Sequence, residues 1–137
     1  MSWNSYVENL MAMGKFTDAA VVGIATKSVW ASHGKLLANI TAAELDVILG
    51  KDRQKFFING LTLGGAKCSV LRDQLNLADD WTMDLKTKSV AGEPTLNISI
   101  ASASKALVVA VGKDGVHGGE INTEAFKVAR YLRDNGY

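Results

Sequence analysis

Short apolar runs separated by turn-forming residues fill most of the chain between residues 19 and 111. Parallel strands need a crossover of a dozen or more residues, whereas antiparallel strands can be joined by a tight turn. Because most successive runs follow one another without a helix between them, they predict an antiparallel sheet with helices packed on it, an α+β fold. The predicted strands are residues 19–25, 29–32, 55–58, 61–63, 67–71, 81–86, 96–100 and 106–111.

Turn chemistry marks the connections within this sheet. Asn59-Gly60 lies between two apolar runs, which is the strongest short hairpin signal, and it predicts a hairpin formed by residues 55–58 and 61–63. Gly64-Gly65 predicts the turn that follows. The run 106–111 has no polar residue at all, which indicates a strand buried on both faces.

Three segments have the spacing of helices. At the amino end, apolar residues recur every three or four positions on a helix that ends before Gly14, with Ser2 as its N-cap. Residues 41–44 have the form of a capping box, and Gly50 is placed to stop that helix in the left-handed conformation. Asn122 is the predicted N-cap of a third helix, which continues almost to the carboxyl end.

Composition narrows the class of protein. The 137 residues are 47% hydrophobic with one proline, so the chain can bury a core as one domain over residues 1–137. A formal net charge of +1 excludes the basic field of a general nucleic-acid binder. The amino end lacks the features of a signal peptide, the run 106–111 is too short to cross a bilayer, and Cys68 has no second cysteine to pair with. These features predict a cytosolic protein.

Residues that carry chemistry are sparse. The glycine-rich turns lack the spacing of a phosphate-binding loop, and His33, Cys68 and His117 are too scattered for a metal site. His117 offers a general base near Asp114 or Ser69, but no nucleophile elbow or oxyanion site accompanies it. We therefore expect a protein that is not an enzyme and that needs no cofactor.

Aromatic residues gather at the two ends of the chain. Trp3 and Tyr6 lie one helical turn apart, and Tyr131 and Tyr137 lie at the opposite end. Ordinary core packing is one interpretation. The other is a groove that grips a polyproline II helix, because Trp and Tyr combine a flat ring with an N–H or O–H donor. The spacing alone leaves both interpretations open.

Basic residues also cluster if neighbouring strands pair. The cluster would contain Lys67, Arg72, Lys86 and Lys88. A solvated strand face and a surface for an anionic partner or lipid head group both fit this pattern.

An ordered series of segments resembles the profilin family of actin-monomer-binding proteins over essentially the whole chain. The first segment is similar to the family's amino-terminal pattern, which runs from a tryptophan through a tyrosine to an Asn-Leu pair. The similar segments are residues 3–10 (WNSYVENL), 50–53 (GKDR), 59–65 (NGLTLGG), 67–70 (KCSV) with Arg72-Asp73, 83–88 (MDLKTK), and 116–119 (VHGG) with Ile121-Asn122.

The resemblance implies a central antiparallel sheet with the N- and C-terminal helices together on one face and smaller helices on the other. In the family, proline-rich ligands lie across aromatic residues of both terminal helices. Tyr131 stands where the vertebrate pattern has histidine, so we expect binding with an altered sequence preference. The implied poly-proline-binding residues are Trp3, Tyr6, Trp30, Tyr131, Leu132 and Tyr137.

The resemblance also implies an actin-facing surface that regulates actin polymerisation and nucleotide exchange. Thr123 stands where lysine is common and Lys127 where vertebrate forms carry glutamate, so we expect actin binding of modified affinity. The implied actin-binding residues are Phe57, Ile58, Lys67, Ser69, Val70, Leu71, Arg72, Asp80, Lys86, Lys88, Thr95, Asn97, Val116, His117, Gly119, Asn122 and Thr123.

Phosphoinositide binding is a third implied activity, weakened by Asp134 at a position where many relatives have arginine. The implied partners are monomeric actin, proline-rich proteins of actin assembly and anionic phosphoinositide head groups, with no nucleic acid, at the cytoplasmic cytoskeleton. Two alternatives are an α/β module that senses a small molecule in an internal cavity and a hydrolase that uses His117. The implied lipid-binding residues are Lys67, Lys86, Lys88 and Arg133.

Overall fold

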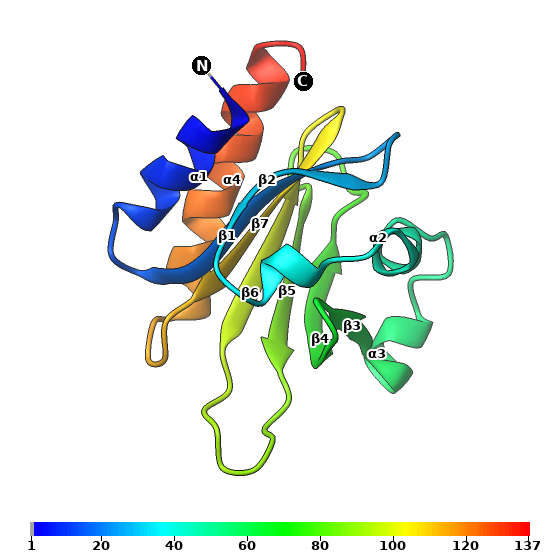
Figure 1. The fold of residues 1–137 in the computed structure, drawn as a ribbon. Helices are drawn as coiled ribbons and strands as arrows, with labels where there is room; N and C mark the ends of the chain where they lie inside the picture. The colour runs from blue at the N-terminus through cyan, green and yellow to red at the C-terminus, as the bar shows by residue number, and fades with distance from the viewer. Residues whose placement is uncertain (1) are drawn as a thin grey trace.

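Figure 1 shows the computed structural model, which describes residues 2–137; Met1, part of the predicted domain 1–137, lies outside the described residues. Seven strands form one sheet in the order β2-β1-β7-β6-β5-β4-β3, and neighbouring strands are antiparallel. The predicted antiparallel α+β fold is therefore confirmed. The strands are β1 (Phe16–Gly23), β2 (Ser28–His33), β3 (Leu61–Leu63), β4 (Ala66–Gln74), β5 (Thr82–Thr87), β6 (Asn97–Ser102) and β7 (Ala106–Gly112).

Helices cover both faces of the sheet (Figure 1). The terminal helices α1 (Trp3–Met11) and α4 (Gly118–Asp134) lie side by side on one face. The shorter α2 (Ala42–Ile48) and α3 (Lys55–Asn59) lie on the other face with the 3₁₀ turn η1 (Leu37–Asn39). This is the arrangement that the resemblance implied. Within residues 2–137, no helix combines the length and apolar composition needed to cross a membrane.

The interior strand β7 is buried along its whole length. Val109 belongs to the core beneath α2 and α3, whereas the preceding Val108 belongs to the core beneath α1 and α4. Successive side chains of a strand point to opposite faces, and here both faces are covered by helices. The uninterrupted apolar run in the sequence follows from this position.

The predicted caps of the first two helices are present. Ser2 Oγ accepts a hydrogen bond from the backbone N–H of Ser5 at 3.3 Å. Thr41 Oγ1 accepts from the N–H of Glu44 at 3.1 Å, and Glu44 Oε1 accepts in return from the N–H of Thr41 at 3.1 Å. This reciprocal pair is the capping box that residues 41–44 predicted.

The prediction that Gly50 ends α2 in the left-handed conformation is wrong. The helix ends at Ile48, whose carbonyl accepts a hydrogen bond from Arg53 Nη1. The same nitrogen donates to the carbonyl of Gly50 at 3.1 Å. Because an arginine side chain satisfies the carbonyls left free at the helix end, no left-handed residue is required there.

The prediction of a strand at residues 55–58 is also wrong, because these residues form most of α3. Gly60, with φ of 64°, caps α3 by donating its N–H to the carbonyl of Phe56 at 2.9 Å. The hairpin lies one turn later, between β3 and β4 around Gly64-Gly65. A glycine of positive φ suits a helix end as well as a hairpin. A run of four residues is too short to show whether it forms a helix or a strand.

The last helix begins at Gly118, five residues before the start that Asn122 as N-cap predicted. His117 is its N-cap, and its Nδ1 accepts from the N–H of Gly119 at 3.0 Å. Two glycines in the first turn are poor helix formers, which concealed this start in the sequence. Asn122 does not cap the helix; its Nδ2 donates to Asp84 Oδ1 at 2.8 Å.

Candidate functional site

Five aromatic rings lie together where α1, β2 and the end of the chain meet. The centroid of the Trp3 ring lies 4.7 Å from that of Trp30, 5.1 Å from that of Tyr137 and 5.9 Å from that of Tyr6. Tyr6 in turn lies 6.0 Å from Tyr131. We call these five residues the aromatic surface. Its formation brings the two ends of the chain together (Figure 1).

Tyr137 reaches this surface because the last residues fold back after α4. Gly136 has φ of 88°, a left-handed turn that lets the N–H of Tyr137 donate to the carbonyl of Leu132 at 2.8 Å. The carbonyl of Tyr137 accepts from the backbone N–H of Lys105, between β6 and β7. The Trp3 and Tyr137 rings meet at 86°, the edge-to-face geometry that aromatic pairs favour.

Trp30 packs directly against the backbone of a glycine in β1. A Cβ added to Gly23 would lie 2.6 Å from two atoms of the Trp30 ring and 2.4 Å from Thr26 Oγ1. Gly23 therefore supports the aromatic surface, a role that the sequence analysis missed. The available signal was a glycine inside a strand, which often marks a close approach.

The aromatic surface presents both flat rings and polar donors. Tyr131 is 50% exposed and Tyr137 is 44% exposed, while Trp3, Tyr6 and Trp30 are half-buried. Burial raises the pKa of the Tyr6 hydroxyl, and the neighbouring Tyr131 and Tyr137 raise it further. The hydroxyl therefore stays protonated at neutral pH and can donate to a ligand carbonyl, as recognition of a polyproline II helix requires.

Leu132 differs from the other residues predicted for this surface. It is 0% exposed and lies in the core beneath α1 and α4, together with Ala125 and Ala129 of the same helix stripe. Leu132 therefore anchors α4 to the sheet, and its contact with a ligand stays a prediction.

Three of the predicted basic residues gather at one end of the β4–β5 pair. Ser69 lies opposite Lys86 in the strand register, and the N–H of Lys88 donates to the carbonyl of Lys67 at 2.9 Å. Lys67 and Lys86 therefore lie on neighbouring strands, and Lys88 follows directly after β5. We call Lys67, Lys86 and Lys88 the lysine cluster.

Exposed apolar side chains accompany the lysine cluster. Ile58 is 84% exposed, Leu71 is 56% exposed and Phe57 is 51% exposed. A Cβ at Gly60 would lie 3.8 Å from Lys88 Nζ, so the end of α3 that carries Ile58 adjoins the cluster. Apolar side chains bordered by charges have the composition of a protein interface.

Asp84 joins the neighbouring strands to α4. Its Oδ1 accepts from Ser99 Oγ and from Asn122 Nδ2, both at 2.8 Å, and its Oδ2 accepts from Arg72 Nη1 at 3.4 Å. Arg72 Nη2 donates to both carboxylate oxygens of Asp80, at 3.0 and 2.8 Å. The network holds Arg72, Asp80 and Asn122 of the predicted actin-facing set in place. Asp84 itself was not predicted.

Most of the remaining predicted actin-facing residues lie near the start of β6 or of α4, and one, Val70, lies in the core. Asn97, at the start of β6, donates from Nδ2 to the carbonyl of Val116 at 3.1 Å and so links β6 to the segment that enters α4. Val70 is the exception, because it is 7% exposed and packs in the core beneath α2 and α3. Strand alternation turns its side chain away from the face that carries Ser69, and its role in actin binding stays a prediction. The residues at or near the start of β6 or of α4 are Thr95, Asn97, Val116, His117, Gly119 and Thr123.

Arg133 does not join the lysine cluster. Its guanidinium packs over the Trp81 ring at 3.7 Å, and its Nε donates to the carbonyl of Ser102 at 2.8 Å. Trp81 precedes β5 and Lys88 follows it, which separates them by roughly 23 Å at about 3.3 Å per strand residue. Desolvation lowers the pKa of Arg133. The four predicted lipid-binding residues therefore do not form one site.

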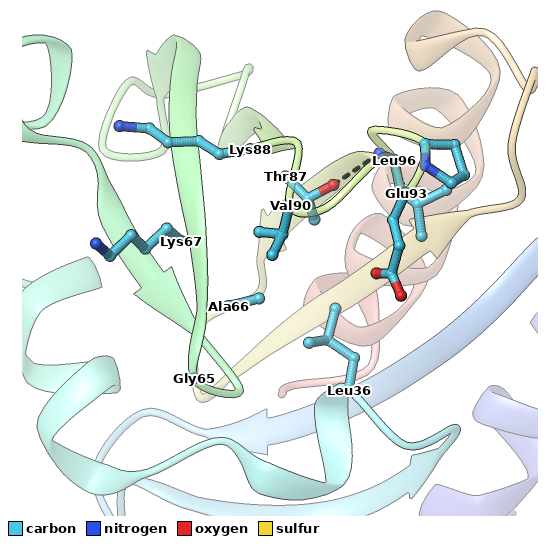
Figure 2. Close-up of a pocket in the computed structure, with 10 residues that line it drawn as sticks. Leu36, Gly65, Ala66, Lys67, Thr87, Lys88, Val90, Glu93 and Leu96 are labelled. Carbon is cyan, nitrogen blue, oxygen red and sulfur yellow. Dashed lines mark hydrogen bonds between the residues drawn. The ribbon is translucent and has the colours of Figure 1, made fainter.

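A cavity of about 520 Å³ adjoins the lysine cluster beneath the loop between β5 and β6 (Figure 2). Leu36, Val90 and Glu93 point toward one another across it, whereas the ammonium groups of Lys67 and Lys88 point away (Figure 2). The polar groups of the lining residues do not converge on one point, so the cavity does not favour a small-molecule sensor. It is lined by Leu36, Gly65, Ala66, Lys67, Thr87, Lys88, Val90, Glu93, Pro94 and Leu96.

The residues considered for catalysis have other roles. His117 is exposed and uses Nδ1 to cap α4. Cys68 is buried, and this burial, with a contribution from Glu44, raises the pKa of its thiol to about 11. A thiol of that pKa is protonated at neutral pH and is a poor nucleophile. Over residues 2–137, no group of three or more His, Cys, Asp or Glu side chains is placed to hold a metal ion.

Comparison with known proteins matches the whole chain to one family. The family model described as Profilin matches residues 1–137. Profilin-2 of Rattus norvegicus is 54% identical over 137 residues, and Profilin-1 of Bos taurus is 53% identical; each match covers 98% of both chains. The structure of mouse profilin IIa in complex with a double repeat from the FH1 domain of mDia1 has a TM-score of 0.97, with 51% identity and 100% of both chains covered.

Proposed function

The chain belongs to the profilin family, and from that premise we propose that it is an actin-monomer-binding adaptor. It binds monomeric actin on one surface, thereby regulating polymerisation and nucleotide exchange on actin, and docks proline-rich assembly proteins on another. Binding is non-covalent, and the chain itself catalyses no reaction. It acts in the cytoplasm, at the cytoskeleton.

The observation that carries this proposal is the aromatic surface. Five rings from α1, β2 and the carboxyl end offer flat faces and hydroxyl donors to a single extended ligand. A polyproline II helix suits such a surface because it is preformed, has exposed carbonyls and loses little entropy on binding. Mouse profilin IIa, at 51% identity, was solved in complex with an FH1 repeat, which supports ligand docking by the same fold.

Support for the actin-binding surface comes from family membership and from the face formed by β4, β5, β6 and the start of α4. The Asp84 network holds polar groups of three strands and one helix in fixed positions, and Leu71 and Ile58 supply exposed apolar area. Preorganised polar groups beside exposed apolar side chains favour a specific protein partner over a partner that is held by charge alone.

The lysine cluster supports weak binding of anionic phosphoinositide head groups. Each lysine near an anionic membrane surface contributes about 1 kcal/mol. We propose that Lys67, Lys86 and Lys88 supply this contact without Arg133, whose guanidinium is held against Trp81. The head group therefore competes with actin for the same three lysines.

Two measurements test the proposed function. A native-gel shift with monomeric actin should show a complex, and titration of a proline-rich peptide should change the fluorescence of Trp3 and Trp30, which line the ligand surface. Actin that migrates unchanged with excess protein present would overturn the actin proposal. Fluorescence that is unchanged at millimolar peptide would overturn the docking proposal.

A further inference from the structure

A small pocket extends the aromatic surface along the groove between the terminal helices. Its volume is about 290 Å³. Tyr6 and Tyr131 line it, and the same two residues form one end of the aromatic surface. A ligand that crosses the aromatic surface can therefore continue into the pocket without leaving the protein. The pocket is lined by Tyr6, Asn9, Lys127, Val128 and Tyr131.

Lys127 is the charged side chain among these lining residues. It is 67% exposed, and its Nζ forms an ion pair with Glu124 Oε1 at 3.2 Å. The Glu124 side chain is only 14% exposed, but the Lys127 side chain is open to solvent, and a helix pair three residues apart contributes only a few tenths of a kcal/mol. The ammonium group has three donors, of which this pair uses one. Lys127 thus presents a cation at the end of the groove.

We propose that the pocket and Lys127 select proline-rich segments that carry an acidic residue beside the proline run. This inference rests on the proposed docking of proline-rich ligands. The partner is a protein segment in polyproline II conformation whose aspartate or glutamate pairs with Lys127 Nζ. Charge complementarity and continuity with the aromatic surface both point to this occupant.

The spacing of the rings sets where the acidic residue lies. From Tyr137 through Trp3 and Tyr6 to Tyr131, successive centroids are 5.1, 5.9 and 6.0 Å apart. A polyproline II helix rises about 3.1 Å per residue, so each step accommodates about two residues and the row about six. Lys127 lies four residues before Tyr131 on α4, a further distance of roughly 6 Å. The acidic residue is therefore expected about two positions beyond the proline over Tyr131.

Three peptides test the inference. Each has the same run of prolines, flanked at both ends by aspartate, by glutamine or by lysine, because a polyproline II helix can bind in either direction. Affinity for the intact protein is measured by tryptophan fluorescence at low salt. The aspartate peptide should bind about two- to fivefold more tightly than the glutamine peptide, which is the gain expected from one exposed ion pair. The lysine peptide should bind more weakly than the glutamine peptide. The preference should shrink in 0.5 M salt, where the screening length is about 4 Å.

Variants of the protein assign the preference to one side chain. Lys127→Met should abolish the preference for the aspartate peptide and Lys127→Glu should invert it, measured in each variant as the ratio of the affinities for the aspartate and glutamine peptides. Lys51→Glu makes the same charge change away from the pocket and should keep the preference. Equal affinities for the aspartate and glutamine peptides, or a preference that survives in Lys127→Glu, would overturn the inference alone. Failure of the glutamine peptide to bind would overturn the proposed docking function and the inference with it.

Discussion

The indole ring of Trp30 lies so close to Gly23 that a Cβ at residue 23 would be 2.6 Å from two ring atoms. Real Cβ atoms do not approach so closely, so Gly23→Ala must displace Trp30 from the aromatic surface. We expect weaker binding of a proline-rich peptide, by at least about threefold, and a loss of roughly 1–3 kcal/mol in the free energy of unfolding from overpacking. Tryptophan fluorescence titration and urea unfolding measure the two effects.

Gly118→Ala is the matched control for this prediction. A Cβ at Gly118 meets the side chain of Asn97 at 3.7 Å, an ordinary contact, and the residue lies in the first turn of α4. Alanine there should leave peptide affinity unchanged and stability unchanged or slightly higher. If the two alanine variants bind peptide equally well, the supporting role of Gly23 is wrong.

Single substitutions should separate the two proposed binding surfaces. Trp3 contacts three other rings of the aromatic surface, so Trp3→Ala should cost about 2 kcal/mol or more in peptide binding, roughly thirtyfold in Kd. Lys88→Glu should weaken actin binding by about 1 kcal/mol, roughly fivefold, and the affinity should fall less steeply with salt because an attractive charge contact is lost. Peptide titrations and native-gel shifts with actin are run on both variants.

Each variant serves as the control for the other. Trp3→Ala should bind actin normally, and Lys88→Glu should bind peptide normally, because Lys88 lies beside the end of α3 on the other side of the molecule from the terminal helices' aromatic surface. A loss of both activities in either variant, with unfolding unchanged, would show that the two surfaces are not independent.

The periodic and terminal features of this fold were predictable from the sequence. The helix at residues 3–11, the capping box at Thr41 and the buried strand at 106–111 each carry several agreeing signals, and each is confirmed. The errors fall where one local signal decided the prediction. Asn59-Gly60 fits a helix end as well as a hairpin, and two glycines concealed the start of α4.

The candidate site was predictable only through the resemblance, because its parts are far apart in the sequence. Trp30 comes from an edge strand, and no periodic pattern connects it to Trp3 or Tyr137. Residues that support the site from beneath the surface were harder still to predict. Gly23 has no side chain, and Asp84 acts through hydrogen bonds to other elements, so only the three-dimensional arrangement reveals either role.

The carboxylate of Glu44 should make stability depend on pH. Besides capping α2, Glu44 accepts from the N–H groups of Gly64 at 2.9 Å and Gly65 at 3.0 Å, which ties α2 to the β3–β4 hairpin. Burial raises the pKa of Glu44, but hydrogen bonds led by those from Gly65 and Thr41 outweigh it, so the pKa lies below its ordinary value of 4.5. A carboxylate whose pKa is lowered by folding stabilises the fold at pH values above its pKa in the unfolded chain. This stabilisation is lost as pH falls through its pKa in the folded protein.

Glu44→Gln should therefore lose about 1–3 kcal/mol of unfolding free energy at pH 7, because an amide cannot accept on both sides. The difference from the original protein should shrink as pH falls below 4.5, the ordinary pKa of the group. Urea unfolding at pH 7 and at lower pH measures this, with the exposed Glu93→Gln as control. A difference that is the same at every pH would show that charge plays no part.

Arg53 and Asp73 form a pair that should be costly to break. Arg53 Nε and Nη2 donate to the two carboxylate oxygens of Asp73 at 2.7 and 2.8 Å, and the Asp73 side chain is only 4% exposed. Burial raises the pKa of Asp73, but the hydrogen bond from Arg53 outweighs it and holds the pKa below its ordinary value. Arg53→Met leaves a buried carboxylate without its partner and frees the carbonyls at the end of α2, so we expect a loss of about 3–5 kcal/mol.

Three further variants distinguish this pair from ordinary surface charge. Arg53→Lys should recover little, because one ammonium group cannot make both parallel bonds. Arg130→Met breaks an exposed pair with Asp134 and should cost less than about 1 kcal/mol. Adding Asp73→Leu to Arg53→Met should restore part of the lost stability, because it removes the unpaired carboxylate. If Arg53→Met unfolds at the same urea concentration as Arg130→Met, the buried pair does not hold α2 and β4 together.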